Sequence, residues 1–262
     1  MFSLPLNIKK RDENKKKYLT FKYYNNIYNM PRNKIYNSII PLNIYQTWFT
    51  KKLPSKMKER VNILKLQNPE FNHYLYDDDD CYEFIKNNFS KDVLNAYDSL
   101  IPGAYKADLW RLCILYINGG FYLDIKLICV NHFKLIELSE NEHYVKDRPL
   151  FSIFNSFMVC QKGNPFLLES INKIVENVKN KFYGDSILSP TGPKMLGSVL
   201  LNKNFRVNID LFHYEFGGYI IYKNIFIIST EYKEYNDEIT SQYSKLNTKK
   251  YSILWNERNI YK

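Results

Sequence analysis

The chain is poor in the residues that mark several common protein classes. It has 9 glycines, 4 cysteines and 4 histidines among 262 residues. So little glycine excludes a collagen-like or low-complexity chain. The cysteines form no Cys-x-x-Cys pair and the histidines have no metalloprotease or zinc-finger spacing, so we expect no zinc site. We interpret the cysteines as buried free thiols, with a disulfide between Cys113 and Cys129 as the alternative.

Long apolar runs are also missing. The first eight residues are interrupted by Pro5 and lack the apolar core of a secretory signal. Residues 219–228 are apolar, but they include Lys223 and Asn224 and are too short to span a bilayer. The sequence therefore predicts neither a signal peptide nor a membrane anchor, and we expect a cytoplasmic location.

Acidic residues are outnumbered by basic ones, 27 to 37, which gives a formal charge of +10. A positive excess suits nucleic acid, an anionic membrane surface or a phosphate-bearing ligand. Residues 9–17 contain a dense run of these basic residues. We interpret residues 1–38 as a basic N-terminal extension, either a solvated tail or a contact for an anionic membrane surface. No nucleic-acid-binding motif is present, so we expect no nucleic-acid partner.

Apolar and aromatic residues are abundant, at 45% and 16% of the chain. This content is sufficient for the core of one large domain. We place that domain at residues 39–262.

Residues 101–126 are the most informative stretch. Pro102 stands where the first turn of a helix tolerates proline, and residues 104–117 are mostly apolar, so we predict a helix. Residues 118–120, Asn-Gly-Gly, are typical of a helix end. The aromatic and apolar residues 121–123 then predict a short buried strand.

Charged side chains interrupt both predicted elements. Asp108 and Arg111 are three positions apart and share one helix face, while Asp124 and Lys126 follow the strand. A simple surface ion pair is one interpretation. The other is a ligand site, because helix, glycine turn and strand end would gather these groups at the carboxyl edge of a sheet, where open α/β sheets bind ligands.

With these residues the chain resembles a known family. Residues 107–111 and 119–126 read Ala-Asp-x-x-Arg and Gly-Gly-x-Tyr-x-Asp-x-Lys. The pattern is similar to the core of the glycosyltransferases with a DXD sugar-binding region, relatives of the yeast initiating α-1,6-mannosyltransferase and of the clostridial glucosylating toxins. One position departs from the family, because its second DXD aspartate is Lys126 here.

Further segments carry the resemblance, each with a plainer alternative. Residues 40–48 match Ile-Pro-x-x-Ile-x-Gln-Thr-Trp, although Tyr45 replaces the usual histidine. The resemblance places Trp48 near the nucleotide base, but a tryptophan after a strand could equally belong to the core. Asn155 is either a ligand contact or part of a turn between strands. Residues 191–193, Thr-Gly-Pro, either border the donor pocket or only form a tight loop.

The resemblance implies a fold and an activity. The fold is GT-A, a Rossmann-like α/β fold with a mixed, mainly parallel sheet and helices on both faces. Strands near 41–46, 71–76 and 121–124 should share one sheet. The activity is transfer of a hexose from a nucleotide-diphosphate sugar to a glycan or protein acceptor, with retention of configuration. The alternatives are a GT-A-like domain that binds a nucleotide sugar or glycan without transfer, and a basic nucleic-acid-binding protein.

The resemblance also assigns roles to single residues. The implied catalytic residues are Asp108, Arg111, Asp124 and Lys126. The implied donor-binding residues are Trp48, Tyr105, Asn155, Thr191, Gly192 and Trp255.

The metal requirement stays open because of Lys126. Asp124 is the candidate ligand for Mn²⁺ or Mg²⁺, but a protonated lysine cannot ligate a divalent metal. In one hypothesis the ammonium group of Lys126 neutralises the donor diphosphate. In another, Asp124, the donor phosphates and a residue of the C-terminal segment still hold the metal. In a third, Lys126 points to solvent.

Elsewhere the pattern gives simpler predictions. The four aspartates at 77–80 lack the spacing of a calcium loop, and Asp80 with Glu83 has the spacing of a helix capping box. We predict helices over 55–67, 80–88, 91–100, 165–181 and 195–201. We predict strands over 127–130, 149–154, 157–160, 205–212 and 220–228.

Overall fold

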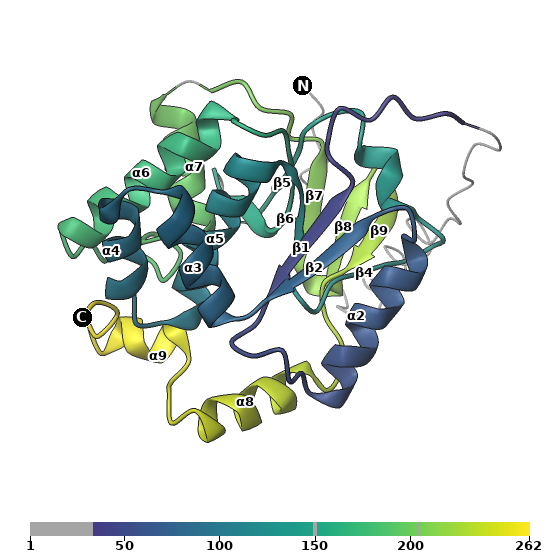
Figure 1. Ribbon diagram of the computed structural model, residues 1–262. Helices are drawn as coiled ribbons and strands as arrows, with labels where there is room; N and C mark the ends of the chain where they lie inside the picture. The colour runs from purple at the N-terminus through teal and green to yellow at the C-terminus, as the bar shows by residue number, and fades with distance from the viewer. Residues whose placement is uncertain (1–33, 149–150, 204) are drawn as a thin grey trace, which may run out of the picture.

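The computed structural model describes residues 34–148, 151–203 and 205–262, and Figure 1 shows their arrangement. The basic run at 9–17 and its predicted membrane contact therefore lie outside the described residues, as does most of the predicted extension. Among the described residues, no helix combines the length and the apolar character needed to cross a bilayer.

The described strands form one nine-stranded mixed sheet. In chain order they are β1 (Asn43–Thr47), β2 (Asn72–Tyr76), β3 (Gly120–Leu123), β4 (Ile128–Cys129), β5 (His143–Lys146), β6 (Ile153–Cys160), β7 (Leu211–Tyr214), β8 (Tyr219–Tyr222) and β9 (Ile225–Ser229). Their order across the sheet is β2-β1-β3-β6-β5-β7-β8-β9-β4. The strands expected near 41–46, 71–76 and 121–124 are thus neighbours, and this prediction is confirmed.

Parallel and antiparallel pairs occupy different places in the sheet. β1 pairs in parallel with both β2 and β3, and β5 pairs in parallel with β7. β6 runs antiparallel between β3 and β5. β7, β8, β9 and β4 follow one another in antiparallel pairs. As a result β1, β3, β5 and β7 all end at the edge of the sheet where β6 begins.

The helices are α2 (Ser55–Gln67), α3 (Asp78–Asn88), α4 (Lys91–Ser99), α5 (Gly103–Asn118), α6 (Pro165–Lys179), α7 (Pro193–Asn202), α8 (Tyr235–Lys245) and α9 (Tyr251–Asn256), with short 3-10 turns at Leu135–Leu138 and Glu215–Gly217. The first six were predicted within a few residues. In Figure 1, helices α3 to α7 lie to one side of the sheet and α2 lies beside β2 and β4.

Two hydrophobic cores cover the two faces of the sheet. Successive strand residues point to opposite faces, so neighbours divide between the cores. Tyr45 and Tyr122 pack into the core built with α3 to α7. Ile44 and Phe121 pack into the other core, together with Leu64 of α2. Helices on both faces of an α/β sheet are therefore confirmed.

The junction between α5 and β3 follows the prediction closely. Gly119 caps α5 with φ 63°, and Gly120 opens β3 with φ 115°. A Cβ atom on Gly120 would stand 2.8 Å from the backbone oxygen of Asn43 in β1. Backbone conformation and the neighbouring strand therefore both require glycine at position 120.

The capping box of α3 lies one turn earlier than we expected. Asp77 is the N-cap residue: its side chain accepts a hydrogen bond from the Asp80 backbone, and the Asp80 side chain accepts one from the Asp77 backbone. The box therefore pairs Asp77 with Asp80, and the pairing of Asp80 with Glu83 was wrong. The acidic run is explained by this cap and by the helix dipole.

The middle of the chain differs from the strand predictions. β5 was missed, because only four residues separate Glu142 from Asp147 and both flanks are charged. The strands predicted over 149–154 and 157–160 are a single strand, β6. Residues 149–150 lie outside the described part of the chain. The predicted strand over 127–130 is the two-residue β4, which pairs with β9 and does not extend β3.

The C-terminal part also differs. The strand predicted over 205–212 begins only at Leu211. The segment 220–228 is the hairpin β8–β9, turned by Lys223 and Asn224 at φ 47° and 61°. Both residues adopt the left-handed geometry that such tight turns need. Helices α8 and α9 were not predicted. All four cysteines are buried and free, as expected, so Cys113 and Cys129 form no disulfide.

Candidate functional site

A cavity of about 620 Å³ follows one edge of the sheet. This is the edge where β1, β3, β5 and β7 end and β6 begins. Residues at these strand ends line it: Trp48 beyond β1, Asp124 beyond β3, Asp147 beyond β5, His213 in β7 and Asn155 in β6. Carboxyl ends of strands are the usual ligand-binding edge of α/β folds, so the cavity is the candidate site.

Helices complete the wall of the cavity. The first half of α5 contributes Tyr105, Asp108 and Arg111. Gly192, at the start of α7, and Tyr235, at the start of α8, also line it. The predicted pairing of helix α5 with strand β3 therefore places their charged residues on one shared cavity.

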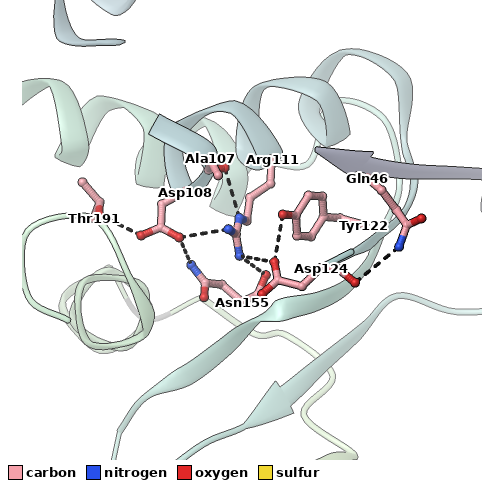
Figure 2. A network of polar contacts seen from close by, with 8 residues as sticks. All are labelled: Gln46, Ala107, Asp108, Arg111, Tyr122, Asp124, Asn155 and Thr191. Carbon is pink, nitrogen blue, oxygen red and sulfur yellow. Dashed lines mark hydrogen bonds and ion pairs between the residues drawn. The ribbon is translucent and has the colours of Figure 1, made fainter. Parts of the chain in front are cut away.

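Arg111 lies between two carboxylates, as Figure 2 shows. Its Nη2 is 3.2 Å from Asp108 Oδ1, and its Nη1 is 3.4 Å from Asp124 Oδ1. The guanidinium also donates to the backbone oxygens of Ala107 and Asn155, at 3.1 and 2.8 Å. One cation from α5 thus ties the helix to the end of β3 and the start of β6.

Asp108 has partners on both of its carboxylate oxygens. Asn155 Nδ2 donates to Oδ1 at 2.9 Å, and Thr191 Oγ1 donates to Oδ2 at 2.8 Å. Gly192 allows close packing here, because a Cβ atom at that position would stand 3.4 Å from Oδ2. Burial raises the pKa of Asp108, while Arg111 and these hydrogen bonds act to lower it.

Asp124 is the more exposed of the two carboxylates, with 26% of its side chain accessible against 11% for Asp108. Tyr122 donates its hydroxyl to Asp124 Oδ1 at 2.9 Å. The backbone oxygen of Asp124 accepts from Gln46 Nε2 at 3.3 Å, and Gln46 Oε1 lies 2.7 Å from His73 Nε2. Residues of β1 and β2 therefore fix the position of this strand end.

The electrostatics of this cluster favour a charged arginine. Burial acts to lower the pKa of Arg111, but the acidic groups Tyr122, Asp124 and Asp108 raise it. The guanidinium also lies 4.4 Å from the centre of the Tyr122 ring, over its face. A single buried cation thus forms ion pairs with two carboxylates. The carboxylate oxygens of the cluster can therefore still accept hydrogen bonds from hydroxyl groups of a ligand.

Lys126 lines the same cavity and packs against α8 instead of extending into solvent. Its Nζ lies 4.8 Å from the centre of the Tyr235 ring, and its backbone oxygen accepts from Arg60 Nε at 2.9 Å. Lys250, at the start of α9, also lines the cavity. Two lysines from distant parts of the chain therefore border it.

The predicted donor-binding residues divide into three groups: residues that line the cavity, one residue that supports Asp108, and one that lies outside the cavity. Trp48, Tyr105, Asn155 and Gly192 line the cavity. Thr191 supports Asp108 through its hydroxyl group and does not line the cavity itself.

Trp255 lies outside the cavity lining. Its indole Nε1 donates to the backbone oxygen of Tyr183 at 2.9 Å. Tyr251, one turn earlier on α9, lines the cavity instead of Trp255. The indole packs against the helical core, where its apolar surface is covered and its N–H finds a partner.

Sequence reasoning missed several cavity residues in the second half of the chain. They are Asp147, His213, Tyr235 and Lys250. Their relevance depends on the pairing of β5 with β7 and on helices α8 and α9, for which the sequence carried no clear pattern.

A family model matches residues 54–144 of this chain, and its description is "Glycosyltransferase sugar-binding region containing DXD motif". The match includes Asp108, Arg111, Asp124 and Lys126. Trp48 and the chain beyond residue 144 lie outside it.

Individual relatives are glycosyltransferases. The chain is 29% identical over 164 residues to inositol phosphoceramide mannosyltransferase 3 of Schizosaccharomyces pombe, covering 62% of this chain and 45% of that protein. It is 38% identical over 94 residues to an uncharacterized glycosyltransferase of Acanthamoeba polyphaga mimivirus, covering 35% and 37%. It is 28% identical over 193 residues to the initiation-specific alpha-1,6-mannosyltransferase of Candida albicans, covering 58% and 50%. The chain thus spans half or less of these relatives' length.

A solved structure has the same architecture. PaToxG glycosyltransferase superposes with a TM-score of 0.50 at 17% identity, covering 63% of this chain and 70% of that chain. A likeness at this identity concerns the fold alone. It confirms the GT-A fold predicted from the sequence.

Proposed function

Because residues 54–144 match the family model of a glycosyltransferase sugar-binding region containing a DXD motif, we propose that this chain transfers a hexosyl group from a nucleoside-diphosphate sugar. The acceptor is a hydroxyl group of a glycan or a lipid. Two of the relatives above are named mannosyltransferases, and one of those names includes a ceramide lipid, so a mannosyl donor and a lipid-linked acceptor are the first to test. We propose that transfer retains the configuration of the anomeric carbon.

The observation that carries this proposal is the buried cluster of Asp108, Arg111 and Asp124 at the ligand-binding edge of the sheet. Carboxylates accept several hydrogen bonds from sugar hydroxyls, and a pair held by one arginine is already oriented to do so. We place the hexosyl group of the donor against Asp108 and Arg111. Asp124, which is more exposed, then binds the ribose.

The nucleotide base belongs at the β1 end of the cavity. Trp48 and Phe49 line it there, with ring centres 4.2 Å apart. Trp48 Nε1 is buried and has no hydrogen-bond acceptor within the described residues. An N–H without accessible surface cannot be reached from the cavity, so we expect the base to be held by stacking on these two rings.

The residues present do not fit a divalent metal held by the protein. Lys126 stands at the second DXD position, and Asp124 Oδ1 is already engaged by Arg111 and Tyr122. Within the described ranges, no group of three or more His, Cys, Asp or Glu residues is placed to bind a metal ion.

We propose that Lys126 and Lys250 take over the electrostatic role. Breaking the bond between the anomeric carbon and the diphosphate leaves negative charge on the departing nucleotide. Cations fixed beside that charge lower the barrier, and this is usually the largest catalytic contribution. Two ammonium groups lining the cavity can supply it without metal coordination.

A second function remains open because of the same substitution. A GT-A domain with lysine in place of the second aspartate could bind a nucleotide sugar or glycan without transferring it. Binding and turnover separate the two, because only the enzyme releases nucleoside diphosphate.

Nucleotide release is the test of the proposal. Purified protein is incubated with GDP-mannose, UDP-glucose and other sugar nucleotides, and free nucleoside diphosphate is measured with and without acceptors. We expect wild-type release with at least one donor and a loss of about 100-fold in Asp108→Asn. The variant should stay folded, because Arg111 keeps Asp124 as its partner.

Two results would contradict it. Stabilisation against heat by a sugar nucleotide without any release would favour the binding domain. Equal release by wild type and Asp108→Asn would place the chemistry elsewhere in the molecule.

A further inference from the structure

A second polar cluster lies at the opposite end of the same cavity from Trp48. β1, which leads to Trp48, is separated from β7 by β3, β6 and β5. At the β7 end, Asp147, Phe154 and His213 line the cavity. These residues follow the segment that the family model matches, so that match gives them no role.

The imidazole of His213 is held on one nitrogen and on one face. Nδ1 lies 2.8 Å from Asp147 Oδ1, and the ring stacks on Phe154 with centres 3.8 Å apart and planes 20° apart. Both partners are largely covered, with side-chain exposures of 12% for His213 and 9% for Asp147. No described residue is hydrogen-bonded to Nε2. With Nδ1–H donated to the carboxylate, Nε2 is a hydrogen-bond acceptor directed by a fixed ring.

The charges at this end select the class of ligand. Asp147, Glu215 and Glu231 line it together with Arg148, and Lys126 lies near Glu231 because Arg60 donates to the backbone oxygens of both. Arg148 lies over the ring of Phe216, 5.0 Å from its centre. An excess of carboxylates repels a phosphate group but accepts hydrogen bonds from hydroxyls. The surroundings of His213 therefore fit a neutral polyhydroxyl group.

The chain contains a second His–Asp pair that serves as a comparison. His143 Nδ1 lies 2.8 Å from Asp210 Oδ1, and this pair also joins β5 to β7. It stands at the other ends of these two strands, because they run in parallel, and it does not line the cavity. If the Asp147–His213 pair did no more than join β5 to β7, its replacement would thus have the same effect as replacement of the His143–Asp210 pair.

We propose that Asp147 and His213 form the acceptor subsite, and that it binds a hydroxyl group of a neutral sugar or cyclitol. This inference rests on the proposed function. The acceptor hydroxyl donates its hydrogen bond to His213 Nε2. Asp147 is a positioning residue, since it fixes the ring and its tautomer. The donor then occupies the cavity from Trp48 to Asp124, and the acceptor enters from the β7 end.

The experiment compares transfer with hydrolysis of the same donor. Nucleotide release is measured with water alone and with methyl α-D-mannopyranoside, methyl β-D-galactopyranoside or myo-inositol as acceptor probes. The proteins are wild type, His213→Gln, Asp147→Asn and the control His143→Gln. Thermal unfolding is recorded for each, because His143→Gln removes an equivalent tie between the same strands.

We expect at least one probe to accelerate release by the wild type and by His143→Gln. In His213→Gln and Asp147→Asn the ratio of transfer to hydrolysis should fall about 30-fold, as for the loss of one well-placed hydrogen bond at a reacting group. Measurable hydrolysis in these variants shows that the donor site is intact.

Three results would overturn the inference: a preserved ratio in His213→Gln, an equal fall in His143→Gln, or no acceleration of the wild type by any neutral probe. If the wild type releases no nucleoside diphosphate from any sugar nucleotide, with or without an acceptor, the proposed function itself fails, and the two failures are therefore distinguishable.

Discussion

Arg111 neutralises two carboxylates that come from different elements, Asp108 in α5 and Asp124 after β3. Removing the shared cation would leave both carboxylates without a counter-ion, and Asp108 is almost fully buried. Such a loss is strongly destabilising, whereas Asp108→Asn leaves Arg111 with Asp124 as its counter-ion. Asp108→Asn is therefore the more informative variant for function.

A second prediction for a single residue concerns the role of Lys126 in nucleotide release. We expect wild-type nucleotide release to persist in EDTA and Lys126→Ala to lose about 100-fold, because the alanine removes a cation from the leaving group. Lys126→Asp restores the two-aspartate pattern and should respond to Mn²⁺. Lys173→Ala, which removes a partly exposed lysine on α6 that pairs with Glu176, is the control and should match the wild type. Wild-type release that EDTA abolishes and Mn²⁺ restores would refute the idea.

His73 predicts a pH dependence of stability. Burial and the nearby Lys65 lower its pKa to about 4 from the ordinary 6.5. Below pH 6.5 the unfolded chain takes up a proton that the folded protein excludes, so stability falls as pH drops from 6.5 towards 4. The full loss is about 3 kcal/mol.

Denaturant unfolding at pH 7 and at pH 5 measures this effect. His73→Gln should show a shallower dependence than the wild type. His132→Asn, which replaces an exposed histidine, should keep the wild-type dependence. Identical slopes for all three proteins would show that His73 titrates as it does in the unfolded chain.

At the scale of elements, the turn from α5 into β3 sets the distance between the two carboxylates. The helix ends at Asn118 and the strand starts two residues later, so that only Gly119 connects them. Gly120 packs directly against the backbone of β1. Any change in this turn should therefore alter both the strand pairing and the cavity.

Two glycines with positive φ allow this to be tested. Gly120→Ala combines an unfavourable φ of 115° with a close approach to Asn43, and should destabilise the fold by about 3 kcal/mol or more. Gly163→Ala has φ 75° but meets nothing within 4 Å, so it should cost only about 1 kcal/mol. Chemical denaturation of both variants gives the difference. Equal costs would mean that the contact with β1 contributes nothing.

Elements with a local signal could be predicted from the sequence. The helix over 103–118 has a proline near its start, an apolar body and glycines at its end. Helices α8 and α9 have neither a clear apolar face nor a clear stop signal, since α8 contains no buried residue. Its role is to place Tyr235 over Lys126, a contact between segments about a hundred residues apart that local patterns do not contain.

At the scale of the whole molecule, the predictable part of the site is the part built from neighbouring elements. Asp108, Arg111 and Asp124 come from one helix–turn–strand unit, so their spacing already indicated proximity. Asp147 and His213 meet only because β5, which pairs with the antiparallel strand β6 on one side, pairs directly with β7 on the other. The sequence does not encode that pairing in any short pattern, and β5 is a four-residue strand between charged flanks.

The position of β4 has a consequence for how the protein is made. Ile128 and Cys129 follow the site strand β3 almost directly, yet they pair with β9 at residues 228–229, on the far edge of the sheet. During synthesis this pairing can form only after about a hundred further residues have left the ribosome. Their synthesis takes on the order of 5–20 s at usual rates of elongation. The loop between β3 and β5 therefore stays without its strand partner until the hairpin β8–β9 has emerged. A nascent chain that stalls before residue 225 would leave β4 without its partner strand.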